Sequence, residues 1–283
     1  MESSTMPPAV VRNEAGRRFD PLADRLKAMA DETLPLVESV TGLPLPDPVV
    51  IRLMRPRAWC TAHARMRRQL LMAESAELSI RRRDLAGISA ALKAGNKERR
   101  RTWPLIGALC AALTPGEPEM IVLPQSLREG GVLDNEPFLY KTVAHEATHL
   151  AQHAATGGKV WAAQDTLFPH LRGTADRDYQ FLLEGHAYWA DHQVTTKILG
   201  ASVPTDGLSP HASSRFRALQ DSLRGSGTRE FLDRAASSVG DIIAEHGLDT
   251  FNQVWASPDL VPTTEEKDDP AAWTARFASL RSA

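Results

Sequence analysis

The pentapeptide His145-Glu146-Ala147-Thr148-His149 lies inside a run, residues 138–155, whose apolar positions indicate a helix with one buried side. In a helix, four residues at a rise of 1.5 Å place the two imidazoles about 6 Å apart on one face, where both can reach one metal ion. Glu146 lies about 100° further round, so its carboxylate can reach a water on the metal rather than the metal itself. The pattern predicts a metal site in which Glu146 is the general base.

The ends of this helix are marked independently of the motif. Asn135 can cap its start, Glu136 and Pro137 suit a first turn, and Gly157-Gly158 can end it. The prediction of a helix therefore does not depend on the histidines. The alternative interpretation is that both histidines lie on a solvated helix face.

A second helix is predicted at residues 179–199, with Asp176 or Asp178 as its cap and Gly200 as its end. One side of it mixes two aromatic rings with two carboxylates: Phe181, Glu184, Tyr188 and Asp191. Such a stripe is expected to be partly buried, and a buried carboxylate must be paired, hydrogen-bonded or bound to a metal. The helix is therefore expected to complete the metal site.

A zinc ion that keeps one position open for water needs a third protein ligand. His153 would lie about 12 Å from His145 along the helix axis, which is too far. We expect Glu184 to be the third ligand. His186, about 200° round the helix from Glu184, is the alternative, either as a ligand or as a substrate contact.

Two more residues of the second helix are candidates for supporting roles. Asp191 is predicted to hold a ligand imidazole through its other ring nitrogen, the alternative being an ordinary surface acid. Tyr188 is a catalytic candidate because its hydroxyl could donate a hydrogen bond to an oxyanion, the alternative being an aromatic of the core.

His145-Glu146-x-x-His149 followed by Leu183-Glu184-Gly185-His186-Ala187 resembles the gluzincin clan of zinc metallopeptidases, whose third ligand is often the Glu of a Glu-Gly-x-Ala motif. The resemblance covers residues 136–199 and implies a zincin-like fold that holds Zn²⁺. Thirty-four residues separate His149 from Glu184, and residues 159–178 among them are expected to form a loop or lid over the cleft. The thermolysin pattern would have Asp at position 188, where this chain has Tyr.

The function expected from these residues is zinc-dependent hydrolysis, in a metallopeptidase that cleaves a peptide bond with metal-activated water. One alternative keeps the metal but acts on a small amide, an ester or a specialised metabolite. The other is a non-catalytic protein that uses a zincin fold for binding, although binding alone has no use for Glu146.

The expected fold is α+β and predominantly helical, with a small sheet whose edge strand packs on the helix of the pentapeptide. Strands are predicted at residues 49–54 and 120–124, the second at a sheet edge because Pro124 ends it. Such an edge could pair with an extended substrate. Residues 58–113 are predicted to be mostly helical, with a buried helix at 105–113. After a flexible N-terminus, residues 1–17, we expect a single catalytic domain, residues 18–283, whose part from residue 158 onward is a helical C-terminal region.

Composition restricts the partners. A net charge of −2 argues against a general nucleic-acid binder. Basic clusters at residues 52–68 and 97–101 are typical of solvated helix faces, with a role toward an acidic substrate or partner as the alternative. Cys60 and Cys110 are expected to be reduced, which favours a cytoplasmic location. No apolar run approaches the roughly 20 residues of a membrane span, so no membrane partner is expected. The expected partner is a peptide or small amide substrate, and the oligomeric state is left open.

Overall fold

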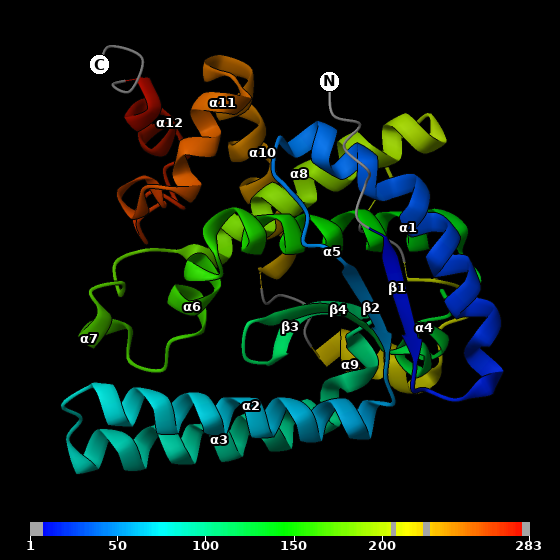
Figure 1. Ribbon diagram of the computed structural model, residues 1–283, viewed down its shortest axis with the longest axis horizontal. Coiled ribbons are helices and arrows are strands. Elements are labelled where there is room, and N and C mark those ends of the chain that lie inside the picture. Colours follow the sequence, from blue (N-terminus) through cyan, green and yellow to red (C-terminus); the bar gives the residue numbers. More distant parts are fainter. Residues whose placement is uncertain (1–7, 205–207, 223–226, 279–283) are drawn as a thin grey trace.

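A four-stranded sheet forms the centre of the structure, a computed structural model that describes residues 8–204, 208–222 and 227–278 (Figure 1). The strand order is β1-β2-β4-β3. The first three of these strands run parallel, and β3 is antiparallel to β4. Their bounds are β1 (Ala9–Asn13), β2 (Val49–Leu53), β3 (Ala108–Thr114) and β4 (Glu117–Val122).

The fold is predominantly helical, as expected. The longer helices are α1 (Asp20–Thr41), α2 (Pro56–Glu77), α3 (Arg82–Thr102), α5 (Glu136–Thr156), α8 (Tyr179–Leu199) and α10 (Thr228–His246). The shorter ones are α4 (Pro124–Glu129), α6 (Lys159–Asp165), α7 (Pro169–Arg172), α9 (Ser214–Ser222), α11 (Leu248–Phe251) and α12 (Pro270–Ala278). Single 3-10 turns are η1 (Arg17–Phe19), η2 (Trp103–Leu105), η3 (Asn252–Trp255) and η4 (Pro258–Leu260).

Two hydrophobic clusters cover the two faces of the sheet. Alternate residues of the central strands, such as Ile51 and Met120, join α1 and α5 in the larger cluster, which includes residues from Ala9 to Phe277. On the other face, Ile121 packs with Trp59 at the start of α2 in a smaller cluster. As Figure 1 shows, α5 and the α2–α3 pair therefore lie on opposite sides of the sheet.

The helices α5 and α8 lie side by side, and α10 packs against the back of α8 (Figure 1). Gly185 permits this second contact. A Cβ atom at position 185 would lie 2.6 Å from the carbonyl oxygen of Ala235 in α10, far inside van der Waals contact. Glycine thus fixes how closely α8 and α10 approach, immediately beside Glu184.

The prediction for residues 105–113 was wrong. The stretch 108–114 is strand β3, which turns through Gly116, in the left-handed region at φ 78°, into β4. A short apolar run does not distinguish a buried helix from a buried strand by periodicity. The edge was also misplaced. Met120 and Ile121 belong to β4, which lies between β2 and β3, so the edge strands of the sheet are β1 and β3. Pro124 does not interrupt the pairing of β4, because the strand ends at Val122 and Pro124 begins α4.

The N-terminal prediction needs correction too. Residues 1–7 lie outside the described parts of the chain, but residues 9–13 form β1 and are not a flexible segment. Their β-branched residues pair in parallel with β2. Pro35 lies inside α1, which continues through it. Within the C-terminal region that is predicted to be helical, residues 205–207, 223–226 and 279–283 lie outside the described residues.

No helix in the described residues is both long enough and apolar enough to cross a membrane.

Candidate metal centre

The helix that carries the pentapeptide begins and ends where the sequence predicts. The Asn135 side chain accepts a hydrogen bond from the Phe138 amide at 3.1 Å, and Gly157 ends α5 in the left-handed conformation at φ 56°. Because the helix packs between the sheet and α8, most of its length is buried, including His149 and Glu146. Because both ends of α5 are fixed and most of its length is packed, His145 and His149 are held in a well-defined part of the helix.

The second helix carries the candidate carboxylates. Asp178 is its cap and accepts from the Phe181 amide at 2.9 Å, while Gly200 ends the helix at φ 79°. Asp176, the alternative cap in the sequence, does not take this role. Glu184 lies at mid-helix on the side that faces α5, and it is partly exposed to the cleft.

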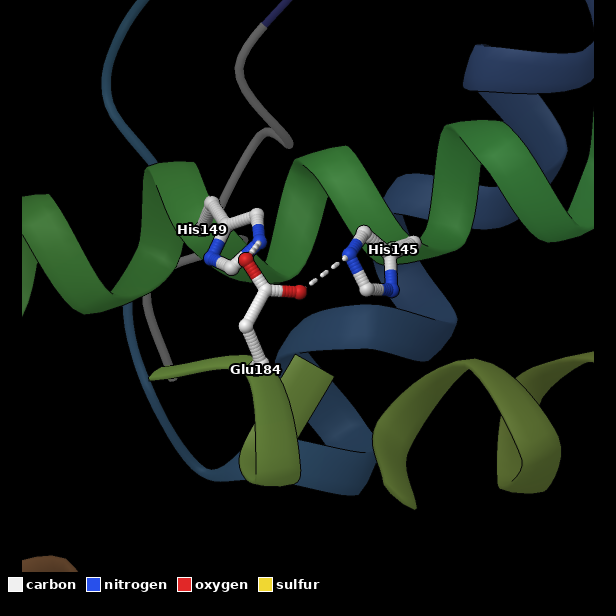
Figure 2. Close-up of side chains that lie close together, drawn as sticks. All are labelled: His145, His149 and Glu184. Atoms are coloured by element: carbon white, nitrogen blue, oxygen red, sulfur yellow. Dashed lines mark ion pairs between the residues drawn. The ribbon is translucent and has the colours of Figure 1, made fainter. Parts of the chain in front are cut away.

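The structure brings His145, His149 and Glu184 together: one ligand atom from each lies within 4.8 Å of the other two. The Glu184 carboxylate oxygens are 3.4 Å from Nε2 of His145 and 3.8 Å from Nε2 of His149. Figure 2 shows the two imidazoles on successive turns of α5, with Glu184 reaching toward both from α8. These are the three residues that the sequence predicts as metal ligands.

Asp191 and Lys141 orient the first imidazole. Asp191, fully buried, lies with one carboxylate oxygen 3.0 Å from Nδ1 of His145. Its other oxygen accepts from Nζ of Lys141 at 2.6 Å. The arrangement matches the supporting role expected for Asp191. Sequence reasoning missed Lys141, although its position four residues before His145 puts it on the same helix face.

At His149, Gln152 and His186 take the place that the charged Asp191 and Lys141 have at His145. The Gln152 amide oxygen lies 2.9 Å from Nδ1 of His149, and its amide nitrogen donates to the Leu183 carbonyl and to Nδ1 of His186. His186 is fully buried and stacks on Trp189, outside the ligand group. It therefore supports Gln152 instead of facing the cleft. Sequence reasoning missed Gln152 as well, although its i+3 spacing from His149 places it near that imidazole on the helix.

These contacts set the charges of the metal-free group. Burial lowers the pKa of His145, but hydrogen bonds to Asp191 and Glu184 outweigh it and raise that pKa to about 10. Burial raises the pKa of Glu184, yet the hydrogen bond from His145 and the charge of His149 bring it to about 2. Burial lowers the pKa of His186 to about 3, so this ring is neutral. The carboxylate of Glu184 is ionised and available to a cation.

Glu146 lies beside this group on the wall of the cleft. Its side chain is buried, and its Oε2 has no hydrogen-bond partner among the described residues. Burial raises its pKa, which suits a carboxylate that takes up a proton. Burial also raises the pKa of Cys110, so the thiol stays protonated and donates to the Glu146 carbonyl at 3.0 Å, joining β3 to α5.

Tyr188 also lines the cleft, one turn after Glu184. Its ring lies edge-on to His145, with centroids 4.5 Å apart, and Nζ of Lys141 is 5.0 Å from the ring centroid. Burial, followed by the charges of Glu184 and Asp191, raises its pKa. The hydroxyl is therefore protonated and can serve as a hydrogen-bond donor.

The residues fit a zinc ion. Two imidazoles and one carboxylate form a donor set that zinc accepts, and both imidazoles meet acceptors at Nδ1, which directs their Nε2 lone pairs inward. Glu146 lines the same cleft, and its Oε2, which has no hydrogen-bond partner among the described residues, would be free to accept a hydrogen bond from a water on the metal. A three-residue donor set leaves room for that water and for a substrate.

The cleft around these residues has a volume of about 550 Å³. Gly107 and residues 108–111 of β3 line it, and α6 contributes Trp161 and Asp165. On the far side, α2 contributes His63 and Met66. The segment 159–178, expected as a loop or lid, contains the helices α6 and α7, and α6 borders the cleft. The position of α2 as a second wall was not predicted from the sequence.

Fold and site together define a zincin-like protein, and the comparisons agree with this class. A family described as zincin-like metallopeptidase matches residues 228–274. This segment extends from α10 into α12, so the match concerns the helices behind α8 and not the pentapeptide itself. No curated protein matches the sequence.

One solved structure is similar over nearly the whole chain. It comes from Chloroflexus aurantiacus and is provisionally described as a hydrolase with a novel fold. The TM-score is 0.58 at 17% sequence identity, with 93% of this chain and 92% of that chain covered. At this identity the similarity shows a shared fold. The fold, the site and the family match over residues 228–274 agree with a zincin-like protein, and no narrower family is assigned.

Proposed function

We propose that the protein is a zinc-dependent metallopeptidase, in which His145, His149 and Glu184 hold Zn²⁺. The observation that carries this proposal is the convergence of their three ligand atoms within 4.8 Å, next to an unpartnered carboxylate oxygen of Glu146. A zinc ion held there would supply Lewis acidity, lowering the pKa of a bound water and polarising a substrate carbonyl.

The protein residues divide the remaining work. Glu146 takes the proton from the attacking water at its free Oε2 and passes it to the leaving amine. Asp191 and Gln152 keep the two imidazoles in the tautomer that directs Nε2 inward. Tyr188, held protonated by its surroundings, donates a hydrogen bond to the oxygen on which negative charge develops.

The edge of β3 favours a peptide over a small amide or ester. This strand pairs with β4 on one side only, and residues 107–111 line the cleft. The free backbone groups of an edge strand can pair with an extended peptide, which holds its scissile bond in a fixed orientation. A small amide would make no use of such an edge.

The proposal is tested by comparing metal content and turnover in two variants. Glu146→Gln should retain zinc and lose peptide turnover by about 10²- to 10⁴-fold, because only the general base is removed. His149→Ala should lose zinc. Elemental mass spectrometry gives the metal content, and a peptide library gives the turnover.

His153→Ala is the matched control, since this histidine is on the same helix but outside the ligand group, and it should retain both zinc and turnover. Full turnover in Glu146→Gln would remove this residue from the base role. Wild-type protein that takes up no zinc even when the ion is supplied would contradict the proposed function.

A further inference from the structure

A pair of long helices, α2 and α3, forms the most basic part of the chain. We refer to residues 56–102 as the helical arm. The arm contains 12 Arg and Lys against 4 Asp and Glu, a net charge of +8. Because the whole chain has a net charge of −2, the rest of it carries −10. Positive and negative charge are therefore separated along the chain, although the net charge of the whole chain is close to zero.

On α3, four of the seven basic residues lie on one side of the helix, and we refer to these four as the basic stripe. The four residues of the basic stripe are Arg82, Lys93, Lys97 and Arg100. At 100° per residue they lie within about 60° of the helix circumference, and at 1.5 Å per residue they extend over about 27 Å. The acids of this helix, Asp84 and Glu98, lie on other sides of it.

The side chains of the basic stripe are exposed and are not neutralised by acidic neighbours in the described parts of the chain. All four side chains are exposed, and none forms an ion pair within the described parts of the chain, whereas the neighbouring Arg81, Arg83 and Arg101 do. No residue of α3 is buried. Its apolar residues, such as Leu85 and Leu92, are half-buried against α2, so the opposite face is left to solvent.

The arm adjoins the candidate active site. From α2, His63 and Met66 line the same cleft as the metal-binding residues, and Arg67 pairs with Asp165 of α6 across its rim at 3.1 Å. Figure 1 shows the two helices side by side along the flank of the molecule, beneath α6 and α7. A chain that leaves the cleft on this side therefore meets the arm.

We propose that the basic stripe of α3 binds an acidic segment of the peptide substrate, outside the cleft in which the peptide is cleaved. The inference rests on the proposed peptidase function and specifies its substrate class. An extended segment of about eight residues matches the length of the stripe. Four positive charges with no negative charge among them are complementary to successive Asp or Glu side chains.

A nucleic acid fits the stripe less well. Among Phe, Tyr and Trp, the arm contains only Trp59, which is buried, so its surface offers no such ring on which bases could stack. The cleft next to the arm presents an edge strand suited to a polypeptide backbone. Both features favour an acidic polypeptide as the occupant.

The test measures binding directly, apart from turnover. A fluorescently labelled octaglutamate is titrated into the full chain carrying Glu146→Gln, so that the probe is not consumed, and anisotropy is read at low and at physiological ionic strength. The stripe variant changes all four bases to Gln. A control variant changes four exposed bases elsewhere to Gln: Arg17, Arg18, Lys159 and Lys197. Both variants lose the same charge.

The expected result is a dissociation constant about tenfold higher in the stripe variant than in the control, with the difference decreasing as salt increases. Equal weakening in both variants would overturn the inference, because net charge alone would then explain binding. Tighter stripe-dependent binding of a DNA oligonucleotide of equal charge would overturn it in favour of nucleic acid. Self-association in sedimentation velocity that is lost only in the stripe variant would assign the stripe to a second copy of the chain.

Failure of this inference is distinguishable from failure of the proposed function. Stripe-dependent binding of octaglutamate without cleavage of any peptide would contradict the peptidase activity and retain the acidic ligand. Cleavage of acidic and neutral peptides at equal rates, with binding indifferent to the stripe, would contradict the acidic preference and retain the peptidase.

Discussion

The helices α3 and α8 are both 21 residues long, yet they depend on different interactions. In α8, eleven residues are buried, and the helix contacts α5 on one side and α10 on the other. In α3, no residue is buried, and the helix touches chiefly its partner α2. The first helix is held by packing, whereas the second depends mainly on intrinsic propensity and on charge pairs such as Arg101 with Glu98.

The difference shows where precision is needed in this molecule. Side chains that must meet within a few ångströms, such as Glu184 and Asp191, are on the helix whose position is fixed by close packing. Side chains that need only present charge are on the helix that is solvated on most sides. Glycine occurs in both helices, which makes the contrast measurable by the same substitution.

The largest effect is expected from Gly185→Ala in α8. The added Cβ would lie 2.6 Å from the Ala235 carbonyl oxygen, so α8 and α10 must separate, and we expect a loss of about 3 kcal/mol in the free energy of unfolding. Urea denaturation measures it. Because Glu184 moves with its helix, zinc affinity should fall as well. A variant as stable as wild type would show that the close contact does not determine the packing.

Asp191→Asn should weaken zinc binding by about 10- to 100-fold, because an outer partner of a ligand imidazole is altered while the ligands remain. The substitution should also lower the stability of the α5–α8 contact, because Lys141 loses its charged partner. Competition with a chromogenic chelator gives the affinity. The matched control is Asp84→Asn, at the solvated start of α3, which should leave zinc affinity unchanged.

The third prediction concerns pH and the buried ring of His186. Its pKa in the folded state is about 3, against 6.5 when exposed, so the unfolded chain binds a proton that the folded chain does not. Stability from this group is complete above pH 6.5 and declines as pH falls toward 3, with a slope of at most about 1.4 kcal/mol per pH unit.

Thermal unfolding of the metal-free protein between pH 7 and 5 measures this slope. In His186→Phe the slope of stability against pH should become smaller. The loss of the hydrogen bond from Gln152 should lower the free energy of unfolding by the same amount at every pH. An unchanged slope would mean that other groups, among them His63 with its pKa lowered to about 4 by burial, account for the acid sensitivity.

The smallest effects, of opposite sign, are expected from Gly87→Ala and Gly95→Ala in α3. A Cβ at either position would meet no atom within 4 Å, so the substitution only improves helix propensity. Each should stabilise the protein by about 0.5–1 kcal/mol in the same urea assay. Destabilisation by either would show that α3 is covered by something other than solvent, which would also bear on the basic stripe.

Sequence patterns predicted the elements with strong local signals. The caps Asn135 and Asp178 and the glycines that end α5 and α8 specify both helices without tertiary information. The spacing of His145, His149 and Glu184 then restricted the candidate ligands to residues that the fold places together. The role of each in binding a metal stays a prediction.

Elements that depend on tertiary contacts could not be predicted from the sequence. The apolar run 105–113 is compatible with either state, and only pairing with β4 makes part of it a strand. The five residues of β1 are too few to stand out until β2 provides a partner. Lys141 and Gln152 are ordinary polar residues in sequence, and their importance comes from side chains on another helix.

The absent side chain of Gly185 has a consequence for protein engineering. Because Glu184 adjoins Gly185, we expect the close contact between the backbones of α8 and α10 to influence how far Glu184 extends into the cleft. A designer who wished to fit a larger ion would therefore begin at Ala235, behind α8, without altering any of the proposed ligands.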